Sequence, residues 1–236
     1  MSSLPRALLL DLDGTLIHSS DDGGRCWAEL CERFAPRLGG LGASELCDEI
    51  RYTARWYWSV AERSRLGRLD LRGARRTIVR RTLERLGVGA AEIGDALADT
   101  YTELREERAT LFPDTLDVLR ALRAKGQRTA LLTNGSGKFQ RGKIERFELG
   151  CFLDVVVIEG EFGVGKPDER VFRHALESLA AKPADTWMVG DDLHADIEGA
   201  QRLGIHAIWI DPSGAGLPCE APVRPDRTIR SLSELI

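Results

Sequence analysis

The chain has 236 residues, of which 43% are hydrophobic and 30% charged, a balance typical of one globular domain or of a domain with an insertion. Its formal net charge of −4 argues against the basic field that recruits nucleic acid, and no apolar run reaches the roughly 18 residues of a membrane span. Five cysteines without a C-x-x-C pair, and an N-terminus without a signal-peptide pattern, are typical of a cytoplasmic protein with reduced thiols.

Short apolar runs alternate with helical patterns over most of the chain. Runs of this length predict strands that are buried on both faces. The predicted strands are residues 6–12, 127–133, 153–159, 185–190 and 205–210, and the predicted helices are residues 113–126, 168–182 and 195–204. This alternation predicts an α/β fold with a Rossmann-like parallel sheet and helices on both of its faces.

One region interrupts the alternation just after the first predicted strand. It contains no convincing strand, and glycine-rich breaks separate helical patterns at about residues 24–37, 43–65, 70–86 and 90–107. We therefore expect an all-helical insertion, residues 18–110, within an α/β core made of residues 1–17 and 111–236. Residues 19–22 (Ser-Ser-Asp-Asp) are the expected hinge into the insertion. A Pro/Gly-rich loop, residues 211–227, precedes a short terminal helix.

Polar residues gather where the predicted strands end. In open α/β sheets, ligands bind at the carboxyl ends of the strands, so these side chains are expected to converge on one crevice. They are Asp11 and Asp13 after the first strand, Thr133 and Asn134 after the second, Lys166 after the third, and Asp191, Asp192 and Asp196 after the fourth. Residues two apart on a strand face the same side, so Asp11 and Asp13 can share that site.

This set of side chains suits phosphate chemistry with a metal. Clustered carboxylates raise one another's pKa, and a hard divalent cation such as Mg²⁺ removes that repulsion while also binding phosphate oxygens. Lys166 and Thr133 supply a positive charge and a hydrogen bond for a phosphate group. A carboxylate can act as a covalent nucleophile, and a neighbouring carboxyl can protonate the leaving oxygen.

The order of these motifs resembles that of the haloacid dehalogenase-like hydrolase superfamily. The motifs are D-x-D-G-T-L, a strand ending in Thr133, a Lys-Pro pair, and G-D-x-x-x-x-D, and the resemblance covers the whole chain because the family's first cap type is a helical insertion after the first motif. The resemblance implies that Asp11 is the nucleophile and a metal ligand. It implies that Asp13 is the general acid/base, with its backbone carbonyl as another metal ligand.

The resemblance also assigns roles to the later motifs. Thr133, Asn134 and Lys166 would bind the phosphoryl group, with Lys166 also paired to Asp11. Asp191 would be a metal ligand. Asp196 would be a secondary acid at the metal site, with Asp192 as the alternative.

Asp13 separates two activities within the family, because the dehalogenase branch lacks this second aspartate. The resemblance therefore implies a Mg²⁺-dependent phosphatase that hydrolyses a small phosphorylated metabolite through an aspartyl-phosphate. The alternatives are a phosphosugar mutase, then a 2-haloacid dehalogenase or a non-catalytic phosphate sensor. Residues 131–144 and 165–204 resemble the branch of N-acylneuraminate-9-phosphatases and nucleotide phosphatases, and phosphoglycolate phosphatases are a further alternative.

Residues 51–85 of the insertion contain eleven arginines. Some of them would grip a second anionic group of the substrate, whereas a solvated helix surface with internal ion pairs accounts for most. We expect Trp56, Tyr57 and Trp58 to pack, Asp114 to cap a helix, and His194 to lie on the surface; His18 is a candidate for the mouth of the crevice. The substrate and the oligomeric state (monomer or dimer) stay open.

Overall fold

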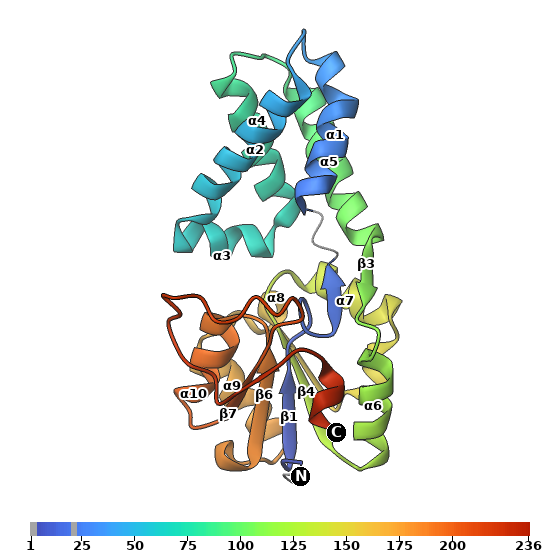
Figure 1. The fold of residues 1–236 in the computed structure, drawn as a ribbon, viewed down its shortest axis with the longest axis vertical. Coiled ribbons are helices and arrows are strands. Elements are labelled where there is room, and N and C mark those ends of the chain that lie inside the picture. Colours follow the sequence, from blue (N-terminus) through green and yellow to red (C-terminus); the bar gives the residue numbers. More distant parts are fainter. Residues whose placement is uncertain (1–3, 20–22) are drawn as a thin grey trace. The chain divides into compact units, whose positions relative to one another are not determined.

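The computed structural model describes residues 4–19 and 23–236, which form two compact units. One unit consists of Met1–His18 and Thr110–Ile236 and is an α/β structure, and the other, Ser19–Ala109, is helical (Figure 1). Of the expected hinge, residues 20–22 lie outside the described part of the chain. Within the described ranges, no helix is long and apolar enough to cross a membrane.

The α/β unit is built on a parallel six-stranded sheet in the order β5-β4-β1-β6-β7-β8. Its strands are β1 (Ala7–Leu10), β4 (Arg128–Thr133), β5 (Val155–Ile158), β6 (Thr186–Gly190), β7 (His206–Ile210) and β8 (Arg227–Ile229). Figure 1 shows β1 in the middle of this unit, and its last residue, Leu10, pairs with Leu131 of β4 and Val189 of β6. This register places the residues that follow β1, β4 and β6 at one edge of the sheet.

Burial on both faces explains the apolar composition of the strands. Ala7 and Leu9 of β1 face one hydrophobic cluster together with Phe172, whereas Leu8 and Leu10 are equally buried and alternate to the opposite face. The unit's helices are α6 (Thr115–Ala124), α7 (Gly137–Arg146), α8 (Glu159–Phe162), α9 (Glu169–Ser178) and α10 (Gly199–Gln201), the last preceded by a π-helix (Leu193–Glu198). Short 3₁₀ turns are Leu149–Phe152, Pro183–Asp185 and Leu232–Leu235. The predicted α/β class and parallel sheet are confirmed.

Several local predictions were incomplete or wrong. The helices α7 and α8, the strand β8, and the two-stranded sheet of β2 (Ile17–Ser19) and β3 (Ala109–Leu111) were not predicted. Asp114 occupies the N-cap position of α6 but makes no side-chain cap. Its carboxylate instead accepts hydrogen bonds from the Ser231 hydroxyl (2.5 Å) and the Ser233 N–H (2.8 Å). It therefore fastens the C-terminal turn to the start of α6.

The helical unit contains five helices and one 3₁₀ turn (Ala35–Arg37) in its described part. The helices are α1 (Gly23–Phe34), α2 (Ala43–Trp58), α3 (Ala61–Leu69), α4 (Leu71–Arg85) and α5 (Ala91–Glu107). The predicted continuous helix 43–65 is wrong, because the chain becomes extended at Val60. The last carbonyl groups of α2 accept hydrogen bonds from side chains, with Ser59 donating to Trp56 and Arg63 donating to Trp56 and Tyr57.

Most arginines of this unit have partners within it. Arg76 and Arg80 on α4 each bind an aspartate of α5, with nitrogen–oxygen distances of 2.5 Å to Asp99 and Asp95. The indole of Trp56 lies under two other guanidinium groups, those of Arg63 and Arg81, at 4.0 and 4.2 Å. These contacts favour the interpretation of the arginine-rich stretch as a helix surface held by ion pairs and cation–π contacts.

Asp168 gives a direct test of what starts α9. Its Oδ1 accepts a hydrogen bond from the Arg170 N–H (3.0 Å), and its carboxylate pairs with the Arg170 guanidinium. These hydrogen bonds lower the pKa of Asp168 to about 2, from an ordinary value of 3.8. Asp168→Ala should lower the free energy of unfolding at pH 7 by about 1 kcal/mol, as measured by urea denaturation.

Folding lowers this pKa, so the carboxylate's contribution is complete above about pH 4 and disappears as the pH falls toward about 2. The difference between wild type and Asp168→Ala should shrink over the same range. Glu177→Ala is the control, because Glu177 is exposed near the other end of α9. Equal losses for the two variants at pH 7 would contradict the capping role.

Candidate active site

The first aspartates stand where β1 ends in a tight loop. Asp11 follows β1 directly and is buried, and its N–H donates to the carbonyl of Val189 on β6. Gly14 completes the loop with a φ of +87°, and a Cβ built on it would lie 2.2 Å from Oδ2 of Asp191. Glycine is therefore required here for both its conformation and its lack of a side chain. The loop thereby brings the first motif against the fourth.

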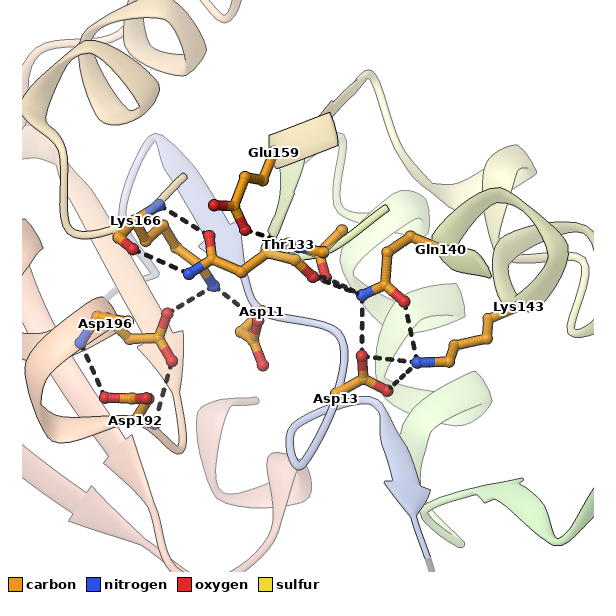
Figure 2. A network of polar contacts seen from close by, with 12 residues as sticks. Asp11, Asp13, Thr133, Gln140, Lys143, Glu159, Lys166, Asp192 and Asp196 are labelled. Carbon is orange, nitrogen blue, oxygen red and sulfur yellow. Dashed lines mark hydrogen bonds and ion pairs between the residues drawn. The ribbon is translucent and has the colours of Figure 1, made fainter. Parts of the chain in front are cut away.

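Lys166 joins two of these motifs through its ammonium group. Its Nζ lies 2.6 Å from Oδ1 of Asp11 and 2.6 Å from Oδ1 of Asp196, and all three side chains are at least nine-tenths buried (Figure 2). Burial alone would lower the pKa of Lys166, but the two carboxylates outweigh it and hold that pKa above its ordinary value. The two carboxylates therefore favour the charged form of the lysine.

Asp191 adds a third carboxylate beside this pair. Carboxylate oxygens of Asp11, Asp191 and Asp196 all lie within 4.8 Å of one another. Although part of Asp191 is exposed, desolvation of its carboxyl, followed by the charges of Asp11 and Asp196, raises its pKa to about 8. Desolvation also raises the pKa of Asp196 to about 7, against the opposing charge of Lys166. Three carboxylates thus lie close together, two of them paired with one ammonium, and this oxygen-rich set fits a hard divalent cation such as Mg²⁺.

Hydrogen bonds fix the backbone that presents these acids. The indole N–H of Trp209 on β7 donates to the carbonyl of Asp191 at 2.8 Å. Oδ1 of Asp192 accepts hydrogen bonds from the N–H groups of His194 and Ala195 and so caps the π-helix. Asp196, the other candidate secondary acid, points to Lys166 instead. Of these two candidates, only Asp196 belongs to the carboxylate group.

The loop after β4 holds Lys166 in place. The Asn134 side chain donates to the carbonyl of Lys166 and accepts from its N–H, both at 2.8 Å. The buried carboxylate of Glu159 accepts a hydrogen bond from the Gly135 N–H at 2.9 Å. Asn134 was predicted to bind phosphate, and its side-chain amide here clamps the lysine backbone. Its phosphate-binding role stays a prediction.

Asp13 lies apart from the Lys166 group and has partners on α7. Its carboxylate oxygens lie 2.7 and 2.8 Å from Nζ of Lys143, and Nε2 of Gln140 donates to Oδ2 at 2.8 Å (Figure 2). The same Nε2 is 2.5 Å from Oγ1 of Thr133, so Gln140 connects two predicted site residues. These contacts were not predicted. Their signal in the sequence was the i, i+3 spacing of 140 and 143 on a helix that follows the carboxyl end of β4.

The histidines contribute little to this group. The exposed ring of His18 packs edge-to-face against Phe112, with 5.1 Å between ring centres. His194 is exposed, as predicted, and its Nδ1 lies 2.5 Å from a carboxylate oxygen of Glu198. In the described part of the chain, neither histidine forms a hydrogen bond or an ion pair with Asp11, Asp13 or Lys166.

Comparisons with known proteins identify a family and a fold. Residues 5–204 match the family model of the haloacid dehalogenase-like hydrolases. A phosphoserine phosphatase of Thermus thermophilus is 38% identical over 68% of this chain, and the match spans 63% of that enzyme's length. An N-acylneuraminate-9-phosphatase of Rattus norvegicus is 29% identical over 98% of this chain and 92% of its own. The solved structure of the HAD-hydrolase YfnB from Bacillus subtilis, bound to magnesium, has the same fold, with a TM-score of 0.72. It is 24% identical in sequence, and the match covers 99% of this chain and 97% of that one.

The raised pKa of Asp191 predicts a pH-dependent cost in the metal-free protein. A carboxyl whose pKa rises from 3.8 to about 8 on folding destabilises the fold increasingly as the pH rises between these values. Asp191→Asn removes that cost. In the presence of a chelator, the variant should therefore have a higher Tm than wild type in thermal denaturation. The Tm difference should be larger at pH 8 than at pH 5.

The exposed Asp117 on α6 provides the matched control, because Asp117→Asn changes a solvated carboxylate. Its Tm difference from wild type should be the same at both pH values. If the Tm difference between Asp191→Asn and wild type did not increase from pH 5 to pH 8, the proposed crowding of carboxylates would be contradicted.

Proposed function

The chain belongs to the haloacid dehalogenase-like hydrolase family, and we propose that it is a Mg²⁺-dependent phosphatase that hydrolyses a small phosphorylated metabolite through an aspartyl-phosphate on Asp11. The observation that carries the proposal is the buried Asp11 carboxylate beside Lys166 and the acids Asp191 and Asp196. A nucleophile, a fixed positive charge and a set of oxygen ligands for a metal are what phosphoryl transfer to a carboxylate needs.

Asp11 is the attacking group in this proposal. Lys166 binds its Oδ1 at 2.6 Å and so fixes the orientation of the carboxylate. The second oxygen, Oδ2, then forms the bond to phosphorus. Lys166 also offsets negative charge on the transferring phosphoryl group. Asp11, Asp191 and the backbone carbonyl of Asp13 would hold Mg²⁺, which supplies further positive charge for the phosphate oxygens.

Asp13 is the general acid in the first half of the reaction and the general base in the second half. In the first half its carboxyl gives a proton to the oxygen of the leaving alcohol. In the second half its carboxylate takes a proton from the water that attacks the phosphorus and frees Asp11. A departing halide needs no such proton, so the presence of Asp13 favours ester hydrolysis over dehalogenation.

The helical unit would act as a cap that limits water and selects the substrate. It is inserted between the first motif and α6, where the sequence predicted a cap at residues 18–110. The relatives named as phosphoserine phosphatase and N-acylneuraminate-9-phosphatase act on small phosphorylated metabolites, which supports the same class of substrate for this chain.

A phosphate-release screen over phosphorylated sugars, acids and nucleotides tests the activity. With Mg²⁺ the wild type should release phosphate, and excess chelator should abolish the release. Asp11→Asn should lower kcat by about 10³-fold or more because it removes the nucleophile. The variant should keep its fold, since Lys166 retains its contact with Asp196.

The control is again Asp117→Asn, which should release phosphate at the wild-type rate. Full Mg²⁺-dependent activity of Asp11→Asn would contradict the assignment of the nucleophile. Conversion of a hexose phosphate to an isomer with little free phosphate would identify a mutase instead. The absence of phosphate release from every ester in the screen would overturn the proposed activity.

A further inference from the structure

The carboxylate of Asp13 is held from one side by α7. Nζ of Lys143 lies 2.7 Å from Oδ1 and 2.8 Å from Oδ2, and Nε2 of Gln140 donates to Oδ2. Oε1 of Gln140 in turn accepts a hydrogen bond from Nζ of Lys143 at 2.9 Å. Figure 2 shows the three side chains closed into one ring of contacts, which the Gln140 amide and Asn134 link to the Lys166 group.

This arrangement differs from an ordinary surface ion pair. Exposed pairs between flexible side chains contribute little, and Asp13 and Lys143 are both partly exposed. Gln140, however, is 3% exposed, and its Nε2 also contacts Oγ1 of Thr133 (2.5 Å) and the carbonyl of Asn134 (3.0 Å). The amide is therefore fixed by the loop after β4. Through it, the orientation of Asp13 is tied to the end of β4.

We propose that Lys143 and Gln140 are positioning residues that orient the Asp13 carboxyl for proton transfer. The inference deepens the proposed phosphatase function and rests on it. Both residues lie in the stretch 131–144 that resembles the branch of N-acylneuraminate-9-phosphatases, but they are outside the four motifs with assigned roles, and the reaction steps described above assign neither of them a role.

The direction of the proton follows from the chemistry of the partners. The ammonium of Lys143 has only donors, and Gln140 presents its NH₂ group to Asp13. Neither group can accept a proton from a neutral Asp13. When Asp13 is protonated, its O–H must therefore point away from α7, where an oxygen of the substrate can accept it.

The balanced steps show which bond this orientation affects. In the first step the bond from Asp11 to phosphorus forms, the bond from phosphorus to the ester oxygen breaks, and the Asp13 proton goes to that oxygen. In the second step the bond from water to phosphorus forms, the bond to Asp11 breaks, and a proton of the water goes to Asp13. Misorientation of Asp13 should slow the first step most when the leaving group is a weak acid.

Two esters of similar size distinguish a misoriented Asp13 from a general loss of active-site structure. The leaving group of p-nitrophenyl phosphate is an acidic phenol that departs readily without a proton, whereas phenyl phosphate releases a much weaker acid. Because kcat/KM covers only the steps through departure of the leaving group, it avoids the later hydrolysis of the aspartyl-phosphate. Each enzyme is assayed with Mg²⁺ on both esters.

Lys143→Met should lower kcat/KM for phenyl phosphate by about tenfold or more, and for p-nitrophenyl phosphate by no more than about threefold. Gln140→Met should also lower kcat/KM more for phenyl phosphate than for p-nitrophenyl phosphate. Asp13→Asn should show the largest difference between the two esters. Lys143→Arg, which keeps a charged donor, should recover part of the kcat/KM for phenyl phosphate that Lys143→Met loses. Lys138→Met is the matched control, because Lys138 is an exposed lysine on the same helix, and it should change neither value.

Equal losses on the two esters for Lys143→Met would indicate a purely structural role and overturn the inference, as would unchanged values for both esters. Circular dichroism checks that each variant is folded, and a selective loss in either Lys143→Met or Gln140→Met supports the proposal. Failure of the proposed function would look different, because the wild type itself would then release no phosphate from either ester or from any metabolite.

Discussion

The ammonium group of Lys166 is buried between the carboxylates of Asp11 and Asp196, and the surrounding loops are arranged to keep it there. A charge taken out of water is costly, and loss of one partner from a buried pair typically costs about 3–5 kcal/mol. The Asn134 amide clamps the lysine backbone, and a π-helix capped by Asp192 presents Asp196. The positive charge of Lys166 therefore connects the ends of β1 and β6, and the loop after β4 holds the lysine through its backbone.

The single positive charge of Lys166 is outnumbered by the carboxyl groups around it. Asp191 brings a third carboxylate, and the raised pKa values of Asp191 and Asp196, about 8 and about 7, reflect the burial and the excess of negative charge. The protein thus holds three carboxylates close together, and glycine at position 14 leaves room for Asp191 among them. Such crowding of acids is expected at the proposed site for a divalent cation and a phosphoryl group.

Much of this could be predicted from the sequence, because short apolar runs followed by polar residues specify a parallel sheet and its functional edge. The position of Asp11, Lys166 and Asp196 in one group follows from that topology. The break between α2 and α3 depends on side-chain hydrogen bonds from Ser59 and Arg63, which no hydrophobic pattern reveals. The helix α7 was missed because its two buried residues, Gln140 and Ile144, give only a weak apolar pattern.

Direct detection of phosphorylated Asp11 tests the central claim most closely. The wild type would be quenched in acid during turnover of p-nitrophenyl phosphate with Mg²⁺, digested, and mapped by mass spectrometry. The account predicts that the peptide containing Asp11 gains the mass of one phosphoryl group, and that fragmentation places the group on this residue. Phosphate release without any such adduct at early quench times, or an adduct on another side chain, would contradict it.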